Sequence, residues 1–414
     1  MSSNIDTVDV TVEGVIPRVL DSREEALAAV AELKERIAAR AEQTEQQRSV
    51  PEETIRELTD AGLFGIVTPR VFGGSELGFA TLLEVQSEIA SACASTGWVY
   101  GVLAGHTWLA ALFPPQAQEE VFADPRALVA SLIRFGGNAP ERVEGGFRWQ
   151  GGQGRFCSGI DHSQWVLLGG TVTEADGTAE GWYMLVPRED IEIIDDWHSV
   201  GLKGTGSKSI IIKDAFIPEH RAVKFSDLGA GRAPGAAIHP GGLYRLAYES
   251  VWPLSLVGTV VGAARGALAE FTANTTRRVS ALPPIAQAAN GPALVRLAKA
   301  AVQIDAMSNL LRQDALESDN APEGTVFSNL DRTRRSRNLA FAAQQLRAAV
   351  NELYESAGGT GVYLTSAIQR WWRDVNTAAS HVAFTWDLAS VAYAREVTGI
   401  SAFSGTGTAP GARK

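Results

Sequence analysis

The hydrophobic pattern of the chain changes its period twice, and this change constrains the fold more than any single motif does. In the first third, apolar residues recur at helical spacing, as in the run from Leu27 to Ile37. Further helices are predicted over about 79–94 and 97–113. We therefore expect a helical N-terminal domain over residues 1–125.

From about Arg126 the pattern becomes that of β-strands. Short segments rich in β-branched and aromatic residues, such as "QWVLLGGTVT" and "SKSIIIKDAFIP", are separated by Gly and Asp turns. No alternation of strands with helices is visible, so a parallel βαβ sheet is not expected. We expect a compact β-domain over residues 126–238.

The last third returns to helical spacing. Four segments are each long enough for a bundle helix: about 244–278, 293–318, 327–357 and 367–398. We expect a four-helix bundle over residues 239–400, followed by a disordered tail over 401–414. The predicted fold class is α+β with three domains, which are helical, β and helical in that order.

Charge and cysteine content exclude several classes of protein. The formal net charge is −10, which argues against a nucleic-acid partner. The two cysteines, Cys93 and Cys157, form neither a disulfide framework nor a cysteine-based zinc site, which suits a reducing cytoplasm. The N-terminus does not resemble a signal peptide, and the apolar stretch around Val251 to Ala264 is expected to be too short to span a membrane.

Three motifs resemble the acyl-CoA dehydrogenase superfamily, and they occur in the order found there. They are "LTDAGLFGIVTPRVFGGSELG", "GLKGTGSKSIIIKDAFIPEH" and "ESAGGTGVYLTSAIQRWWRD". The resemblance covers about residues 55–395. It implies an acyl-CoA dehydrogenase-like fold, a flavin held between the β-domain and the bundle, and a homotetramer.

The chain departs from the dehydrogenases at two points. No Glu lies between Arg373 and Asp387, where their catalytic base is commonly found. After Arg278 the chain reads "VSALPP" where the superfamily often has Phe-Gly, which leaves FMN as open as FAD. "STGWVYGVLAGHTWLAALFP", "FCSGIDHSQW" and "DDWHSVGLKGTGS" are similar instead to the two-component flavin-dependent monooxygenases of the aromatic hydroxylase type.

This second resemblance implies the oxygenase component of such a system. It would receive reduced flavin, FMNH2 or FADH2, from a separate flavin reductase, form a C4a-hydroperoxide with O2, and hydroxylate a small aromatic substrate such as a phenol or indole. The glycine clusters lack the strand and helix context of a dinucleotide-binding site, which fits this division of labour. An acyl-CoA dehydrogenase with a relocated base, an oxygenase of sulfur or nitrogen atoms, and a catalytically silent scaffold remain alternatives.

Three residues are candidates for catalysis. The resemblance places His381 on the last helix, two turns after Asp374, and an imidazole with a pKa near ~6.5 suits a base that takes a phenol proton. His106 could hold the substrate hydroxyl or touch the flavin, and Ser131 could bind a phenol oxygen. A hydrogen-bonded structural role remains open for each of them.

Five residues are candidates for flavin binding by resemblance. Ser158 would meet the polar edge of the flavin ring near N5, where a donor would slow the loss of H2O2. The other four are Trp197, Thr205, Ser207 and Arg278, of which Arg278 would meet a flavin phosphate across a subunit boundary. A plain strand end, a glycine-rich turn and a solvated helix end are the structural alternatives.

Substrate contacts are predicted for Trp98, which would wall the pocket, and for Tyr244 and Arg245, which follow a Gly- and Pro-rich loop. An ordinary core tryptophan and a surface loop are the alternatives. The six histidines are scattered and include no i,i+4 pair, so no metal site is predicted.

Overall fold

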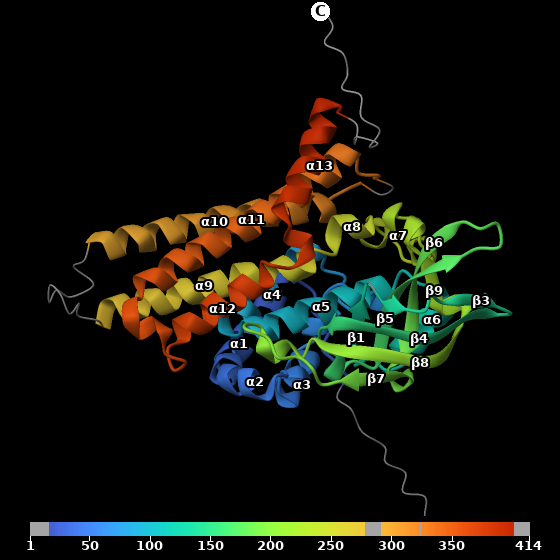
Figure 1. Ribbon diagram of the computed structural model, residues 1–414, viewed down its shortest axis with the longest axis horizontal. Helices are drawn as coiled ribbons and strands as arrows, with labels where there is room; N and C mark the ends of the chain where they lie inside the picture. The colour runs from blue at the N-terminus through green and yellow to red at the C-terminus, as the bar shows by residue number, and fades with distance from the viewer. Residues whose placement is uncertain (1–15, 134, 278–290, 323–324, 401–414) are drawn as a thin grey trace, which may run out of the picture.

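The computed structural model describes residues 16–133, 135–277, 291–322 and 325–400. Helices pack along one end of the molecule and two β-sheets form the other end (Figure 1). The arrangement is the predicted α+β fold. Two predictions, the flavin-phosphate role of Arg278 and the disordered tail 401–414, lie outside the described residues.

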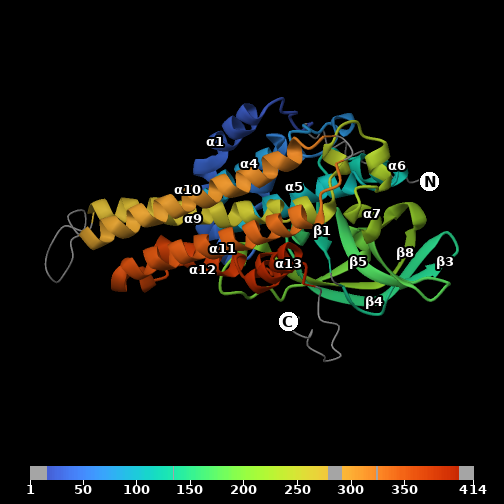
Figure 2. The ribbon, with the colours of Figure 1, turned by 90° about the horizontal axis from the view of Figure 1, so that it is seen from above.

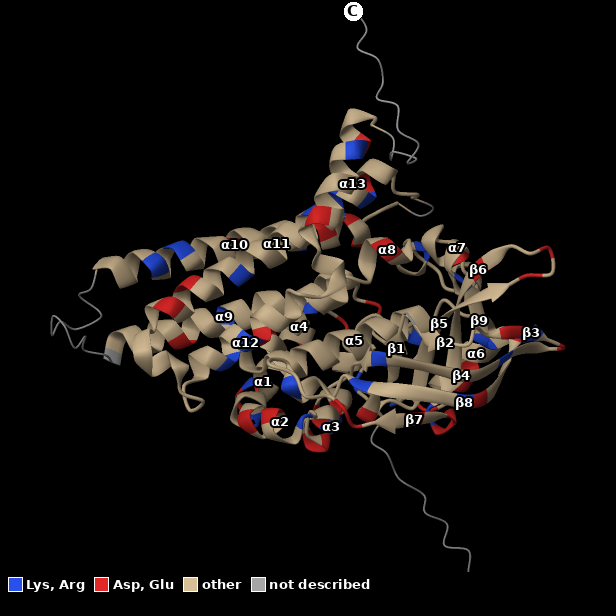
Figure 3. Cartoon of the chain, in the orientation of Figure 1, with Lys and Arg blue, Asp and Glu red and all other residues tan. Residues whose placement is uncertain are grey.

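The N-terminal part consists of helices, as the helical spacing predicted. They are α1 (Arg23–Ala39), α2 (Ala41–Gln47), α3 (Glu52–Asp60), α4 (Phe79–Ala92), α5 (Ala94–Ala110) and α6 (Pro115–Phe122), with short 3-10 turns at Leu63–Gly65 and Arg70–Phe72. Helix α5 is buried along almost its whole length. It carries no Lys, Arg, Asp or Glu, whereas charged side chains of both signs cover the outer helices (Figure 3).

Close packing of α5 depends on its glycines. A Cβ atom at Gly101 would lie 2.0 Å from the Ser255 carbonyl oxygen and 1.9 Å from the Gln86 amide nitrogen. Only a residue without a side chain lets α5 approach helices α4 and α9 this closely. The site residues on α5 are therefore held against a rigid helical layer.

The β-domain consists of two sheets that face each other. The strands are β1 (Val129–Leu132), β2 (Gly136–Gly137), β3 (Glu141–Val143), β4 (Gly146–Cys157), β5 (Trp165–Thr173), β6 (Ala179–Pro187), β7 (Ile191–Ile194), β8 (Lys208–Pro218) and β9 (Ala222–Lys224). One sheet has the order β1-β5-β6-β9, and the other has β2-β4-β8-β7 with β3 paired to β4. The pair β1 and β5 is parallel, and the other pairs are antiparallel.

Strand β4 ends in a bulge beside the candidate flavin residues. The register of β4 against β8 shifts between Gly154 and Cys157, and Phe156 has a φ of 73°. A bulky residue in this left-handed region is strained, so the surrounding structure must hold it there. The bulge turns the strand toward Ser158 and Gly159.

The C-terminal part contains more helices than the four predicted. They are α8 (Tyr248–Val251), α9 (Leu254–Arg277), α10 (Gly291–Asp319), α11 (Asn329–Ser356), α12 (Ala367–Ala378) and α13 (Trp386–Thr398), with short 3-10 turns at Leu243–Arg245, Gly358–Val362 and Val382–Phe384. Helix α7 (Phe225–Gly229) and a 3-10 turn at Pro234–Ala237 lie within the range predicted for the β-domain. Helices α9 to α12 run side by side, and α13 points in another direction while it packs against α11 through the ring pair Phe341 and Trp386 (Figures 1 and 2). The prediction of one helix over 367–398 is wrong, because the chain turns at Ala379–Thr385.

One helical span in the described part of the chain, Tyr248–Thr276, is long and apolar enough to cross a membrane by length and composition. This span is longer than the sequence suggested. However, 78% of its apolar window is buried inside the protein, as expected of a core helix.

Candidate active site

A chain of hydroxyl groups lies at the end of β4. The indole N–H of Trp98 donates to Ser158 Oγ at 3.1 Å, Ser158 Oγ lies 2.7 Å from Ser207 Oγ, and Ser207 Oγ lies 2.7 Å from Thr205 Oγ1. Thr205 Oγ1 donates in turn to the Leu202 carbonyl at 2.9 Å. We call Ser158, Ser207 and Thr205 the hydroxyl chain; the sequence predicted all three as flavin contacts.

The last acceptor fixes the direction of the hydroxyl chain. A hydroxyl has one proton, and Thr205 donates its proton to the Leu202 carbonyl oxygen. Ser207 therefore donates to Thr205, and Ser158 donates to Ser207. Ser158 Oγ accepts one hydrogen bond from Trp98 and keeps one lone pair for another donor. In this arrangement Ser158 Oγ presents an acceptor where the sequence led us to expect a donor, and its contact with the flavin stays a prediction.

His106 and Ser131 form a second polar pair, between α5 and β1. His106 Nδ1 lies 3.0 Å from the Val129 carbonyl oxygen, and His106 Nε2 lies 3.0 Å from Ser131 Oγ. A carbonyl can only accept, so Nδ1 carries the proton and Nε2 accepts from the Ser131 hydroxyl. Burial lowers the pKa of His106 to about 4, so the ring is neutral at neutral pH.

His381 lies in the break between α12 and α13, where it caps the 3-10 turn Val382–Phe384. The prediction that it stands on the last helix, on one face with Asp374, is wrong because α12 ends at Ala378. The Ala383 N–H donates to His381 Nδ1 at 3.2 Å. Burial lowers the pKa of His381 to about 4, so the ring is neutral and its proton is on Nε2.

His381 belongs to a row of aromatic rings that the sequence did not reveal. Its ring centroid lies 5.6 Å from that of Trp98 and 6.1 Å from that of Trp252, both in edge contact. Trp252 stacks on Tyr248 at 5.8 Å with an interplanar angle of 13°. We call Trp98, His381, Trp252 and Tyr248 the aromatic wall. Trp252 and Tyr248 come from the start of the bundle, far from Trp98 in sequence, so no local motif signals their contact.

An exposed aromatic pair lies next to the hydroxyl chain. The strained Phe156 is 66% exposed, and its ring meets that of Trp197 edge-on at 6.0 Å. Trp197 Nε1 donates to the Leu202 carbonyl, which also receives the end of the hydroxyl chain. A flat ligand with a polar edge suits this combination of aromatic surface and adjacent hydroxyls. The sequence predicted Trp197, but not Phe156, because a positive φ is not visible in sequence.

Asp374 has a structural role that sequence did not predict. Its carboxylate accepts the Leu202 N–H at 2.7 Å, and burial raises its pKa to about 6. The neighbouring Arg373 binds the Val200 carbonyl and Glu45. Helix α12 thereby fixes the loop that holds Trp197 and the acceptor of the hydroxyl chain.

Tyr244 and Arg245 bind backbone carbonyls of other parts of the protein. The Tyr244 hydroxyl donates to the Val67 carbonyl, and its ring packs on His239. Arg245 Nε donates to the Ala236 carbonyl. Their predicted substrate contact stays a prediction.

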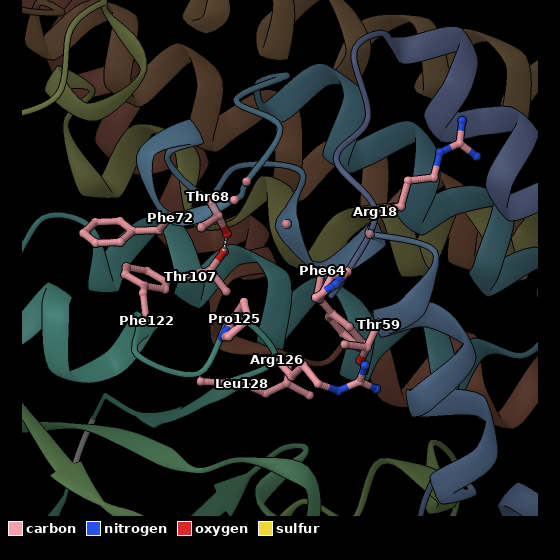
Figure 4. Close-up of a pocket in the computed structure, with 16 residues that line it drawn as sticks. Arg18, Thr59, Phe64, Thr68, Phe72, Thr107, Phe122, Pro125, Arg126 and Leu128 are labelled. Carbon is pink, nitrogen blue, oxygen red and sulfur yellow. Dashed lines mark hydrogen bonds between the residues drawn. The ribbon is translucent and has the colours of Figure 1, made fainter. Parts of the chain in front are cut away.

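A separate pocket lies between the N-terminal helices and the start of the β-domain (Figure 4). In it, Thr68 donates a hydrogen bond to Thr107, the chain neighbour of His106. None of the predicted catalytic or flavin residues lines this pocket. Within the described residues no group of three or more His, Cys, Asp or Glu could hold a metal ion.

Comparison with known proteins decides the family. The acyl-CoA dehydrogenase N-terminal domain matches residues 21–123 and the acyl-CoA dehydrogenase C-terminal domain matches residues 254–386, together more than half of the chain. The FADH(2)-dependent resorcinol hydroxylase, oxygenase component, of Rhizobium sp. (strain MTP-10005) is 36% identical over 87% of this chain and 90% of its own. This chain belongs to the acyl-CoA dehydrogenase family. Within it, the chain is one of the flavin-dependent monooxygenase oxygenase components.

Two solved structures have the same fold as this chain. The crystal structure of the HsaA monooxygenase from M. tuberculosis superposes with a TM-score of 0.85 at 32% identity, over 92% of this chain and 98% of that one. XiaF from Streptomyces sp., in complex with FADH2 and glycerol, superposes with a TM-score of 0.84 at 27% identity, over 92% and 96%. The predicted family and fold are thus confirmed.

Proposed function

We propose that this protein is an oxygenase component that uses reduced flavin and O2 to hydroxylate a phenol, with an indole as the alternative aromatic substrate. Reduced flavin supplies an electrophilic oxygen atom taken from O2. The observation that carries the proposal is the Ser131–His106 pair, a neutral proton acceptor held on the same helix as Trp98, which begins the hydroxyl chain.

The flavin ring is proposed to lie against Phe156 and Trp197, with its polar edge at the hydroxyl chain. The remaining lone pair of Ser158 Oγ suits an N–H donor, and the N5 position of a reduced flavin is such a donor. Gly159 has a φ of 71° and carries no side chain, so the backbone can approach a flat ligand closely there. Ser207 and Thr205 would then orient the Ser158 hydroxyl rather than touch the reacting atoms.

Ser131 and His106 are proposed to accept the phenol proton. A phenol resembles the tyrosine side chain, which ionises near pKa ~10, so its ring becomes strongly nucleophilic only as that proton leaves. The substrate hydroxyl would donate to Ser131 Oγ while Ser131 passes its own proton to His106 Nε2. The Val129 carbonyl stabilises the resulting imidazolium through Nδ1–H.

His381 is proposed to act as a hydrogen-bond donor and not as the base expected from sequence. Its Nδ1 is occupied by the Ala383 N–H, so only the Nε2–H can serve a ligand. A neutral N–H donor stabilises oxygen that gains negative charge, either on the phenol or on the atom being transferred. Trp98 and Trp252 fix the orientation of the ring on either side.

A separate reductase is proposed to supply the reduced flavin, and a homotetramer to complete the assembly in the cytoplasm. Apolar side chains on two bundle helices support the tetramer, because they stay exposed in one copy: Val295 and Val302 on α10, and Leu388, Val391 and Val397 on α13. Helix α13 buries only Ala389 (Figure 1). Light scattering of the purified protein should give four times the chain mass; a monomer would contradict the tetramer.

The test of function compares the protein with and without a reductase. The purified chain with NADH, flavin and a phenol should form no product. Adding a reductase that releases reduced flavin should yield a product carrying one oxygen atom from isotopically labelled O2. Flavin reduction by the chain alone would refute the need for a partner, and bleaching of a bound flavin by an acyl-CoA would select the dehydrogenase alternative.

A further inference from the structure

The aromatic wall ends at a pair of tyrosine hydroxyls that the proposed chemistry does not use. The Tyr248 hydroxyl lies 2.8 Å from the Tyr183 hydroxyl, and the two rings meet edge-on at 5.6 Å. Among the described residues neither hydroxyl has a second hydrogen-bond partner. Two hydroxyls carry two protons, and their mutual hydrogen bond uses one of them.

The burial of the two tyrosines shows which of the two hydroxyl protons lacks an acceptor. Tyr183 is 1% exposed, whereas Tyr248 keeps accessible surface. A wholly buried O–H must use the acceptor within its reach, so Tyr183 donates to Tyr248. The proton of Tyr248 is therefore the one without an acceptor.

Tyr248 is partly accessible, as are the two histidines of the candidate site. Burial raises its pKa well above the ordinary value for tyrosine, although the side chain remains partly accessible. Burial also lowers the pKa of His106 and of His381, and both side chains are partly accessible as well. The aromatic wall joins Tyr248 to His381 through Trp252, so the accessible Tyr248 hydroxyl lies at the end of the same row of side chains.

The sheet connects the tyrosine pair to Ser131. Ser131 is in register with Leu167 of β5, and Leu167 with Leu185 of β6. Tyr183 is two residues from Leu185, so it points to the same face of the sheet as Ser131. Two strand spacings and a two-residue offset place the two Cα atoms about 12 Å apart.

We propose that the Tyr248 hydroxyl is a second anchor for the substrate, and that it selects phenols with a neutral hydrogen-bond acceptor across the ring. The inference rests on the proposed function of the same site. Ser131 and Tyr248 would meet opposite ends of such a phenol, because its hydroxyl and its para carbonyl, amide or ether oxygen lie on opposite sides of the ring.

The local charge favours a neutral acceptor over a carboxylate. Burial raises the pKa of Tyr183 and Tyr248, and the negative charge of Glu249 raises both further. A carboxylate bound at Tyr248 would meet the same negative potential. A neutral carbonyl oxygen accepts the hydrogen bond without this repulsion.

The test uses 4-hydroxyacetophenone and 4-isopropylphenol, which have similar shapes but differ in the para acceptor. Their binding to the flavin-free protein can be followed by tryptophan fluorescence, because Trp98 and Trp252 lie in the aromatic wall. Wild-type protein should prefer 4-hydroxyacetophenone by about three- to tenfold, the equivalent of one net hydrogen bond. Tyr248→Phe should bring the ratio of the two dissociation constants close to one.

Tyr183→Phe is the matched control. This variant removes the Tyr183 hydroxyl and so breaks the same hydrogen bond as Tyr248→Phe does. It leaves the Tyr248 hydroxyl in place, so the preference should persist. Equal loss in both variants would mean that the pair only holds α8 on the sheet and would overturn the proposal, as would tighter binding of 4-hydroxybenzoate than of 4-hydroxyacetophenone. Because binding is measured without flavin, ligand selection without turnover would count against the proposed function alone.

Discussion

His106 and His381 are held in opposite ways although burial lowers the pKa of both to about 4. His106 lies within the continuous helix α5, and a strand carbonyl fixes its proton on Nδ1. His381 lies at a break between two helices, and a backbone N–H fixes its proton on Nε2. One ring therefore accepts from Ser131, and the other presents a donor.

We therefore expect the backbone partner of each histidine, and not its pKa, to decide its role. Both rings are neutral at neutral pH, so charge does not distinguish them. Exchanging the backbone partners would exchange the roles. The following experiments test whether the two histidines differ as their partners require.

The largest effect is expected from His106→Asn. The asparagine amide can still donate to the Val129 carbonyl, but the acceptor for the Ser131 proton is lost. Product formation in a single turnover should fall by roughly 10²- to 10⁴-fold, the usual worth of a general base. Raising the pH toward ~10 should restore part of the rate, because solution then supplies phenolate. A wild-type rate at neutral pH would exclude His106 as the acceptor.

A smaller effect is expected from His381→Ala. Loss of one hydrogen bond to a group that gains charge costs about 1–3 kcal/mol, so oxygen transfer should slow by roughly 10- to 100-fold. His381→Gln keeps an N–H donor near the position of Nε2 and should recover part of the rate. High pH should not rescue His381→Ala. If it did, His381 would be the base and the comparison with His106 would fail.

Ser158→Ala tests the hydroxyl chain, which is linked to His381 through Trp98. Removal of the Ser158 oxygen leaves the Trp98 N–H without its acceptor and removes the proposed partner of the flavin edge. H2O2 release per flavin oxidised should rise by about tenfold at the expense of product. Ser207→Ala is the control, because it alters the orientation of Ser158 without removing the contact. An equal H2O2 yield in wild type and Ser158→Ala would remove the side chain from this role.

The sequence predicted the order of the three parts because hydrophobic period reports local structure. It also predicted Ser158, Ser207 and Thr205 as flavin contacts, because each of them lies in a short motif. It could not predict that these hydroxyls bond to one another, because Ser158 follows β4 and Ser207 precedes β8, and these two strands meet only in the folded sheet. The aromatic wall was missed for the same reason.

The position of His381 shows a different limit of sequence. The stretch from Ala367 to Thr398 has helical composition throughout, with no Pro or Gly to mark a break. The turn after Ala378 is set by tertiary contacts such as Phe384, which is buried, and by His381 itself as the cap. The proposed donor role of His381 follows from that turn, whereas the sequence predicted a base.

The smallest effect is expected on the stability of the wild-type protein, where buried His381 and buried Asp319 act against each other. The pKa of His381 is lowered from 6.5 to about 4, so the unfolded chain takes up its proton first as the pH falls, and stability decreases between pH 6.5 and 4. The pKa of Asp319 is raised to about 6 by burial, so the folded chain takes up its proton first, and stability increases between pH 6 and 4. Each contribution is at most ~3 kcal/mol, and wild-type stability should change little in this window.

His381→Asn should gain stability relative to wild type on acidification, whereas Asp319→Asn should lose it. Urea unfolding at a series of pH values measures both differences, and parallel curves for the three proteins would show that neither group is desolvated in the folded state.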